Sequence, residues 1–380
     1  MTTTFEVIVI GGGTMGSAVA WELGKRGLKG LVLEQFRHVH QFGSHGGKTR
    51  IIRHAYAESP DYVPLVRRAD ALWLELEAAT GVKVLHRTGG LEIAGPGHEH
   101  AQAARASAEE HGLDYEWLTA SDANRRWPAF TIPDDWQVLY SPDAGFLLTD
   151  PSLMALATAA RQLGVAILEE EPARAWGAGG SGVWVRTDQA TYYADHLIVA
   201  AGPWAGSVLS DLGLPLTVLR KVLWWFEVTN ASLYRPDCFP IFISGSDSGE
   251  LYGFPIYDHA GLKIANHLGG HPTSPDTVDR SVTEAEKDEV VSGAQVFLKG
   301  VTRRAVDHAV CLYTATPDTD FIIDRHPDYA RVAIAAGFSG HGFKFATAVG
   351  EHLVDLVLNP LADPYPRLAL SRFATASGAI

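Results

Sequence analysis

A glycine-rich turn between a strand and a helix near the start of the chain constrains the fold more than any other feature. The apolar run Phe5 to Ile10 predicts a strand, followed by GGGTMG at 11–16 and then by apolar residues at helical spacing. A second apolar run at 31–33 ends at Glu34. Dinucleotide sites use this order of strand, glycine turn, helix and acid. The glycines let the backbone approach a pyrophosphate at the helix N-terminus, while the acid accepts hydrogen bonds from the ribose hydroxyls. The predicted site consists of Gly11, Gly13, Thr14, Met15, Gly16 and Glu34.

Two further glycine-rich turns follow apolar strands, at residues 197–202 and 332–342. One dinucleotide-binding motif together with two distant glycine-rich turns favours FAD, which is long and extended. A nicotinamide cofactor would be held by only one half of such a domain. The second return leads into a helix whose first turn carries Lys344, where a cation and the helix N-terminus would favour the negative charge of reduced flavin. The alternative is a solvated lysine at a helix start. We expect FAD, with Gly202, Gly340, Gly342 and Lys344 in its site.

Two groups of cations lie outside these turns. The segment 43–53 places Arg50 and Arg53 beside glycines, where they could hold a flavin edge or a substrate carboxylate, although a basic surface loop explains them equally well. Lys263 and His267 are four residues apart in an apolar run, so on a strand they would share a face. A lysine in an apolar strand is paired, functional or at a sheet edge.

The alternation of strands, turns and helices at both ends of the chain, with more β-like sequence between them, predicts an α/β fold. We expect a Rossmann-like FAD-binding domain interrupted by a substrate domain with a mixed or antiparallel sheet. The predicted FAD-binding domain consists of residues 1–84, 147–219 and 322–380, and the predicted substrate domain of residues 85–146 and 220–321.

Charge and cysteine content exclude several classes of function. A formal net charge of −13 disfavours nucleic acid and anionic membrane surfaces as partners, which favours a small-molecule ligand. Because the chain has no apolar stretch of membrane-spanning length and no basic leader before its first strand, we expect a cytoplasmic protein. Its two cysteines, Cys238 and Cys311, exclude a disulfide framework and a cysteine-based zinc cluster, and we expect no metal site.

Several long strings of residues resemble the family of monomeric sarcosine oxidase and N-methyltryptophan oxidase. They are GSH at 43–45, TRIIRHAY at 49–56, YGFP at 252–255, FIID at 321–324 and GFSGHGFKF at 337–345. The resemblance implies a two-domain fold like that of p-hydroxybenzoate hydroxylase, a monomer, and FAD bound covalently through a cysteine. It also implies oxidation of a secondary amine to an imine with oxygen reduced to hydrogen peroxide, and release of formaldehyde when an N-methyl group is attacked.

The resemblance also implies roles for individual residues. The cysteine that would carry the flavin as an 8α-S-cysteinyl group is Cys311, whereas Cys238 is expected to be a packing residue. Arg53 and Lys344 correspond to a clamp for the substrate carboxylate, and Lys263 to a lysine that promotes oxygen reduction. The remaining implied site residues are Arg50 and Ser44 at the flavin and His267, Tyr252 and Tyr313 in the substrate pocket, with His267 also a candidate base.

The chain departs from the family at one point, reading GSHGGKTR at 43–50 where GSHHGDTR is common. A lysine gained and an acid and a histidine lost near the flavin alter local pKa values and oxygen access. Residues 219–225 and 263–270 resemble the N-methyltryptophan branch, but residues 325–327 resemble the sarcosine branch. The preferred amino acid therefore stays open, as do an oxidase of cyclic imino acids such as pipecolate or proline, an amine dehydrogenase using another acceptor, a nicotinamide-dependent reductase and a non-catalytic flavin-binding protein.

Overall fold

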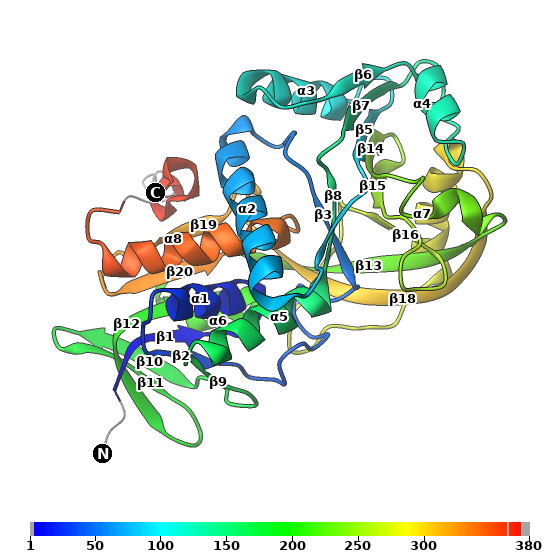
Figure 1. Ribbon diagram of the computed structural model, residues 1–380. Helices are drawn as coiled ribbons and strands as arrows, with labels where there is room; N and C mark the ends of the chain where they lie inside the picture. The colour runs from blue at the N-terminus through cyan, green and yellow to red at the C-terminus, as the bar shows by residue number, and fades with distance from the viewer. Residues whose placement is uncertain (1–3, 363–364, 374–380) are drawn as a thin grey trace, which may run out of the picture.

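The computed structural model describes residues 4–362 and 365–373 and is built around two large β-sheets (Figure 1). The first sheet has eight strands, of which β9, β2, β1, β12 and β20 run parallel in that order. Its strands are β1 (Thr4–Ile10), β2 (Gly30–Leu33), β9 (Ala166–Leu168), β10 (Ala175–Gly179), β11 (Gly182–Arg186), β12 (Thr191–Val199), β19 (Ile322–Arg325) and β20 (Val332–Ala336).

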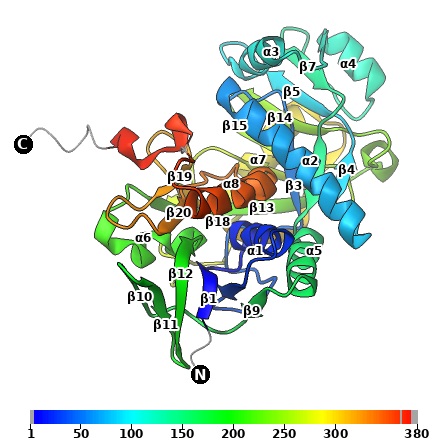
Figure 2. The ribbon, with the colours of Figure 1, turned by 60° about the vertical axis from the view of Figure 1, so that its left-hand side comes forward.

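Helices cover this sheet and bury its apolar residues. Helices α1 (Thr14–Lys25), α5 (Thr149–Gln162) and α8 (Ala346–Leu358) lie next to one another, and α2 (Val63–Thr80) crosses α5 and α8 (Figure 2). Helix α8 approaches α1 very closely at Gly350, where an added Cβ would stand 2.7 Å from the carbonyl carbon of Ala18. Only glycine permits that approach. The predicted strand–helix–strand unit at residues 5–34 is confirmed. The apolar runs at 183–185 and 192–200, on either side of a turn at 188–189, also predict a hairpin, which is confirmed as β11 and β12.

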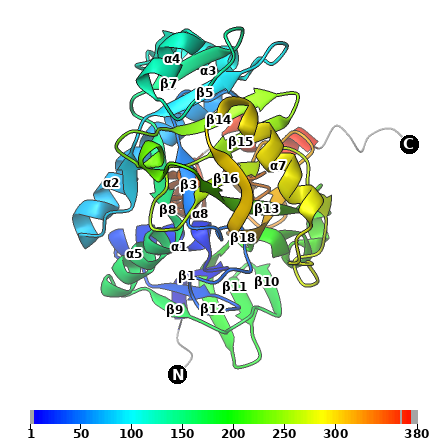
Figure 3. The same cartoon turned by 90° about the vertical axis from the view of Figure 1, so that its right-hand side faces the viewer.

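The second sheet has nine strands and is mostly antiparallel. Its strands are β5 (Gly90–Ala94), β6 (Glu116–Leu118), β7 (Gln137–Ser141), β13 (Thr217–Val228), β14 (Ile241–Ser246), β15 (Gly249–Gly253), β16 (Leu262–Asn266), β17 (His271–Pro272) and β18 (Val301–Ala315). Helix α7 (Glu284–Phe297) packs on one face of this sheet, whereas α3 (His100–His111) and α4 (Ala120–Arg126) lie at its far end (Figure 3).

A small three-stranded sheet lies between the two large ones and consists of β3 (Thr49–Ile52), β4 (Leu85–Arg87) and β8 (Gly145–Leu148). The first sheet draws its strands from segments 4–33, 166–199 and 322–336, and the second from segments 90–141 and 217–315. The predicted division at residues 84, 146, 219 and 321 remains a prediction, and residues 1–3, 363–364 and 374–380 of the predicted FAD-binding domain lie outside the described residues.

The two faces of the sheet have different neighbours at β13 and β16, because successive side chains along a strand point to opposite faces. Trp224, Phe226, Leu262 and Ile264 join the core beneath α7. The opposite face carries their neighbours in sequence, including Trp225 and Lys263, which are directly opposed across the two strands. Within the described ranges, no helix is both long and apolar enough to cross a membrane.

Candidate active site

The turn between β1 and α1 is so tight that two of its glycines cannot be replaced. Gly11 has φ of +98°, and a Cβ there would stand 2.5 Å from the carbonyl oxygen of Ala200 in the segment after β12. A Cβ on Gly16 would stand 1.7 Å from the carbonyl oxygen of Gly11. Gly13 has open space where its Cβ would be. The turn is therefore packed against its own sheet while one side of it stays free for a ligand.

Glu34 closes β2 beside this turn and is buried. Its Oε2 accepts a hydrogen bond from the Gly12 N–H at 2.7 Å, and its Oε1 accepts one from the Phe36 N–H at 2.9 Å. The carboxylate thus fixes the glycine turn to the end of the second strand, and it lines the cavity that begins there.

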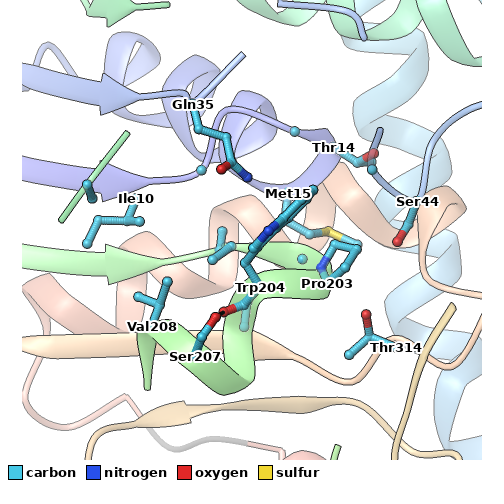
Figure 4. Close-up of a pocket in the computed structure, with 18 of the residues that line it drawn as sticks. Ile10, Thr14, Met15, Gln35, Ser44, Pro203, Trp204, Ser207, Val208 and Thr314 are labelled. Atoms are coloured by element: carbon cyan, nitrogen blue, oxygen red, sulfur yellow. Dashed lines mark hydrogen bonds between the residues drawn. The ribbon is translucent and has the colours of Figure 1, made fainter. Parts of the chain in front are cut away.

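An elongated cavity of about 780 Å³ extends from this turn (Figure 4). This volume lies within the range of pockets that enclose small molecules and cofactors, roughly 300 to 1,000 Å³. Most of its wall comes from five separate parts of the chain, near residues 10–50, 172–177, 200–211, 312–314 and 335–343, and Asp276 and Tyr329 complete it. The predicted cofactor residues on its wall are Gly11, Gly13, Thr14, Met15, Glu34, Ser44, Arg50, Gly202, Gly340 and Gly342, but Gly16, Cys311 and Lys344 are not.

A second cavity of about 60 Å³ adjoins the first, because Arg50, Tyr313, Gly340 and Phe343 line both. The smaller cavity brings together most of the predicted substrate residues. Those on its wall are Arg50, Arg53, Tyr252, His267, Tyr313 and Lys344. A molecule held in the smaller cavity would therefore lie at one end of a molecule held in the larger.

Arg53 is buried, which rules out the reading of segment 43–53 as a solvated basic loop at this position. Its guanidinium donates to both carboxylate oxygens of Glu58 at 2.9 and 2.7 Å, and lies 3.4 Å from an oxygen of Glu92. Burial opposes the charge, but Glu58 and Glu92 more than offset it and raise the pKa of Arg53. The cation is therefore permanent in this cavity.

Lys344 is buried in a single-turn 3₁₀ helix, Phe343–Phe345, which precedes α8. The sequence predicted that the helix itself begins near Phe343, whereas α8 begins at Ala346. The Lys344 Nζ donates to the Tyr56 hydroxyl at 3.2 Å and to the His341 carbonyl oxygen at 3.0 Å. Burial and the neighbouring Arg53 lower the pKa of Lys344 to about 7. An anion in the cavity would stabilise its charged form.

Lys263 lies in β16, between β13 and β15, so it is not the edge-strand lysine that the sequence left open. Its Nζ donates to the carbonyl oxygens of Gly47 at 2.6 Å and Thr49 at 2.8 Å, and to the Thr49 hydroxyl at 3.0 Å. These three acceptors use every N–H of an ammonium group. Burial, and next the Arg50 guanidinium, lower the pKa of Lys263 well below its ordinary value. The lysine stands just behind the cavity walls rather than on them.

His267 follows the last residue of β16, and it is half-buried beside Tyr313. The Tyr313 hydroxyl lies 3.4 Å from its Nδ1. Burial lowers the pKa of His267 to about 4 despite the nearby Glu58, and burial raises the pKa of Tyr252 to about 12. Near neutral pH the cavity therefore presents an uncharged imidazole and a protonated phenol.

Cys311 is buried in β18 directly opposite Lys221 of β13. Directly opposed residues share a face of a sheet, and Cys311 packs with Leu223, Trp225 and Tyr313 on the face away from α7. Its neighbours Leu312, Tyr313 and Thr314 line the large cavity. Cys238 is half-buried outside both cavities, and its thiol donates to the carbonyl oxygen of Ser232.

Sequence reasoning missed three ionisable residues that the fold adds to this region. Lys221 is buried and donates to the carbonyl oxygens of residues 267–269, at 3.0, 2.5 and 3.2 Å, so it holds the segment that carries His267. Glu58 and Glu250 line the small cavity. Lys221 lies within an apolar run typical of a strand, so the pattern that singled out Lys263 could also have singled out Lys221. No pattern in the neighbouring sequence indicates a role for Glu58 or Glu250.

Comparison with known proteins agrees with this geometry. Residues 6–356 match the family described as FAD dependent oxidoreductase. Monomeric sarcosine oxidase from Bacillus sp. (strain B-0618) is 40% identical over 367 residues, covering 94% of this chain and 93% of that protein. N-methyl-L-tryptophan oxidase from Yersinia pestis (strain Pestoides F) is 37% identical over 350 residues, covering 91% of this chain and 93% of that protein.

Solved structures agree on the fold. NikD, an amino acid oxidase essential for nikkomycin biosynthesis, has a TM-score of 0.85 and 24% identity, covering 97% of this chain and 98% of that one. L-proline dehydrogenase from P. horikoshii has a TM-score of 0.82 and 22% identity, covering 99% of each chain. The family match and the identities over nearly the full chain confirm the expected α/β fold and the expected cofactor, so this chain belongs to the FAD dependent oxidoreductase family.

Proposed function

We propose that this protein oxidises secondary amino acids, in particular N-methyl amino acids such as sarcosine or N-methyltryptophan. The products would be an imine and hydrogen peroxide, and hydrolysis of an N-methylene imine would release formaldehyde. The observation that carries this proposal is the pair of buried cations, Arg53 and Lys344, in a small cavity that adjoins the large one. The printed names of the relatives at 37 to 40% identity favour the same substrate class.

The large cavity fits FAD because its walls include the glycine turn, Glu34 and two distant glycine-rich segments. FAD would supply the capacity to take two electrons from a CH–NH unit, leaving C=N, and to deliver them to oxygen. We propose that Gly11, Gly13, Thr14, Met15, Gly16 and Glu34 bind its adenosine and pyrophosphate half, and that Ser44, Arg50, Gly202, Gly340, Gly342 and Lys344 lie toward the flavin. We also propose a thioether between Cys311 and the flavin 8α-methyl group, since Cys311 shares a sheet face with Tyr313 of the cavity wall.

The residues of the small cavity would perform the remaining tasks. Arg53 and Lys344 would hold the substrate carboxylate, which fixes the amine and its neighbouring carbon toward the large cavity. The same two cations disfavour an ammonium group nearby, so the substrate amine would bind unprotonated. His267, with its low pKa, can accept a proton, and Tyr252 can donate a hydrogen bond. We propose that the protein acts as a monomer, while its expected cytoplasmic location stays a prediction.

Anaerobic flavin bleaching tests the proposed function. The purified holoenzyme is mixed without oxygen with sarcosine, N-methyltryptophan, other N-methyl amino acids, proline and pipecolate, and flavin absorbance is followed. Rapid bleaching by at least one N-methyl amino acid is expected, and admitting air should then yield one hydrogen peroxide per substrate oxidised. Bleaching without peroxide would identify a dehydrogenase, bleaching only by proline or pipecolate would identify a cyclic imino acid oxidase, and no bleaching would exclude the activity.

Replacing either residue of the carboxylate clamp should weaken the binding of amino acids more than the binding of amines that lack the carboxylate. In Arg53→Ala or Lys344→Ala, apparent affinity for the preferred N-methyl amino acid should fall by about ten- to a hundredfold, because a charge-assisted hydrogen bond is worth roughly 1.5 to 3 kcal/mol. The decarboxylated amine should lose far less. The control is Lys83→Ala, an exposed lysine paired with Glu77. Equal losses for acid and amine would show that these residues do not bind the carboxylate.

Carboxylate binding should also depend on pH through Lys344. Its pKa of about 7 means that its ammonium form is lost as pH rises through that value in the empty cavity. Propionate, which has no amine to titrate, should therefore bind more weakly at pH 9 than at pH 6, as measured by perturbation of the flavin spectrum. Lys344→Met should bind propionate weakly at both values. A wild-type affinity that does not change with pH would contradict the assignment.

A further inference from the structure

One carboxylate in the small cavity has no role in the proposed chemistry. Glu250 lies on β15, two residues before Tyr252, so both side chains are on the same face of the strand. Its carbonyl oxygen accepts the His267 N–H at 2.7 Å, and both residues line the cavity. Its side chain is 22% exposed, whereas those of Arg53 and Glu92 are each 2% exposed. Glu58, the other acid on the wall, is 27% exposed, so both carboxylates that line the cavity are partly open to solvent.

The cations around Glu250 already have other partners. The Arg53 guanidinium is hydrogen-bonded to Glu58 and lies near Glu92. His100 Nε2 is 2.5 Å from a Glu92 oxygen, while its Nδ1 is 3.8 Å from Glu250 and beyond hydrogen-bonding distance. Over residues 4–362 and 365–373, the Glu250 carboxylate accepts no hydrogen bond.

A bound amino acid would disturb the balance of charge around this cavity. Glu58, Glu92 and Glu250 face Arg53, Lys344 and His100, and a substrate carboxylate at Arg53 and Lys344 would be a fourth anion. Burial, together with the nearby Glu58, already raises the pKa of Glu250. A positive group on the substrate near Glu250 would restore the balance and supply the missing hydrogen-bond donor.

We propose that Glu250 determines substrate specificity by binding a cationic group on the substrate side chain, so that preferred substrates are secondary amino acids with an ammonium or guanidinium side chain. This inference rests on the proposed function. Its geometric basis is that Glu250 shares one cavity with the clamp residues, is partly exposed, and has a carboxylate that accepts no hydrogen bond from the described residues. A substrate held by its carboxylate at Arg53 and Lys344 would have this acid in the same cavity to receive a side-chain cation.

Matched substrates that differ only in a terminal charge test the inference. Nα-methyl-lysine and Nα-methyl-arginine are compared with the neutral Nα-methyl-norleucine in anaerobic rapid mixing with the holoenzyme, at pH 8. The ratio of reduction rate constant to dissociation constant should be about ten- to a hundredfold higher for at least one cationic substrate, since the charged hydrogen bond is made only there. In Glu250→Gln that advantage should vanish while the value for Nα-methyl-norleucine is retained.

Glu289→Gln is the matched control, because Glu289 is an acid outside the cavity whose carboxylate accepts a hydrogen bond from Asn266. It should keep the wild-type preference. Equal values for charged and neutral substrates in the wild type, or a preference that survives in Glu250→Gln, would overturn the role of Glu250 while leaving the oxidase function intact. If no secondary amino acid bleaches the flavin, the proposed function fails and the specificity inference fails with it.

Discussion

Lys263→Met is expected to slow the reaction of the reduced enzyme with oxygen by about a hundredfold or more, the scale seen when one preorganised electrostatic group is removed from an active site. Methionine keeps the length of the side chain and removes its charge. The Lys263 Nζ is held by three acceptors on Gly47 and Thr49, next to Arg50 of the cavity wall, so its position is fixed before oxygen arrives. Reduction of oxygen creates negative charge, which a fixed cation stabilises.

The measurement separates the two halves of the catalytic cycle. Enzyme reduced anaerobically is mixed with oxygen to give the oxidative rate constant, and oxidised enzyme is mixed with substrate to give the reductive one. Only the oxidative constant should fall strongly in Lys263→Met, and Lys83→Met, at an exposed position, should change neither. If oxygen reacts at the wild-type rate in Lys263→Met, Lys263 is not the oxygen-activating residue. The cost of losing three hydrogen bonds should appear separately, as a lower Tm.

Cys311→Ser is expected to convert covalently bound flavin into flavin that is released on denaturation. After acid precipitation of the wild type, the yellow colour should stay with the polypeptide, whose mass should exceed that of the chain by one FAD. A thioether requires a thiolate nucleophile. Cys311 supplies the sulfur from β18, directly opposite Lys221 of β13. Serine has nearly the same size but is not a nucleophile of comparable strength.

Cys238→Ser is the matched control, since Cys238 is the other cysteine of the chain and lies away from both cavities. It should retain the colour and the mass increment. Free FAD in the supernatant of fully loaded wild-type protein would disprove the linkage, while the family membership and the proposed oxidation would be unaffected.

Local patterns predicted those parts of the fold that depend on neighbours in sequence. The unit from β1 to β2 could be recognised because Gly11 and Gly16 allow backbone approaches that no other residue tolerates. The hairpin of β11 and β12 has a short turn, and β20 precedes a glycine-rich turn as expected. The short 3₁₀ turn at Phe343–Phe345 was not predicted, because its residues have the same apolar spacing as the first turn of a helix.

Contacts between distant segments could not be read from the sequence in the same way. The pairing of Lys221 with Cys311 depends on the register of β13 and β18, which changes at bulges near Trp225 and Phe226. The pairing of Arg53 with Glu92 depends on how β5 packs near residues 53–58. Glu58 is close to Arg53 in sequence, but a lone glutamate in a loop resembles any solvated acid. The family resemblance supplied expected roles for Arg53 and Lys344, but it gave no reason to single out Glu250.

The origin of most of the cavity wall in five separate parts of the chain has a consequence for cofactor loading. The glycine turn near residue 11 forms one part of the wall, and Gly337 to Phe343, far away in sequence, form another. A chain in which either segment is unfolded lacks part of the site, so the cofactor can be held stably only when both segments have folded together. Cofactor supply should then govern how much newly made protein reaches its stable state, because a ligand that binds only the folded form adds to its stability.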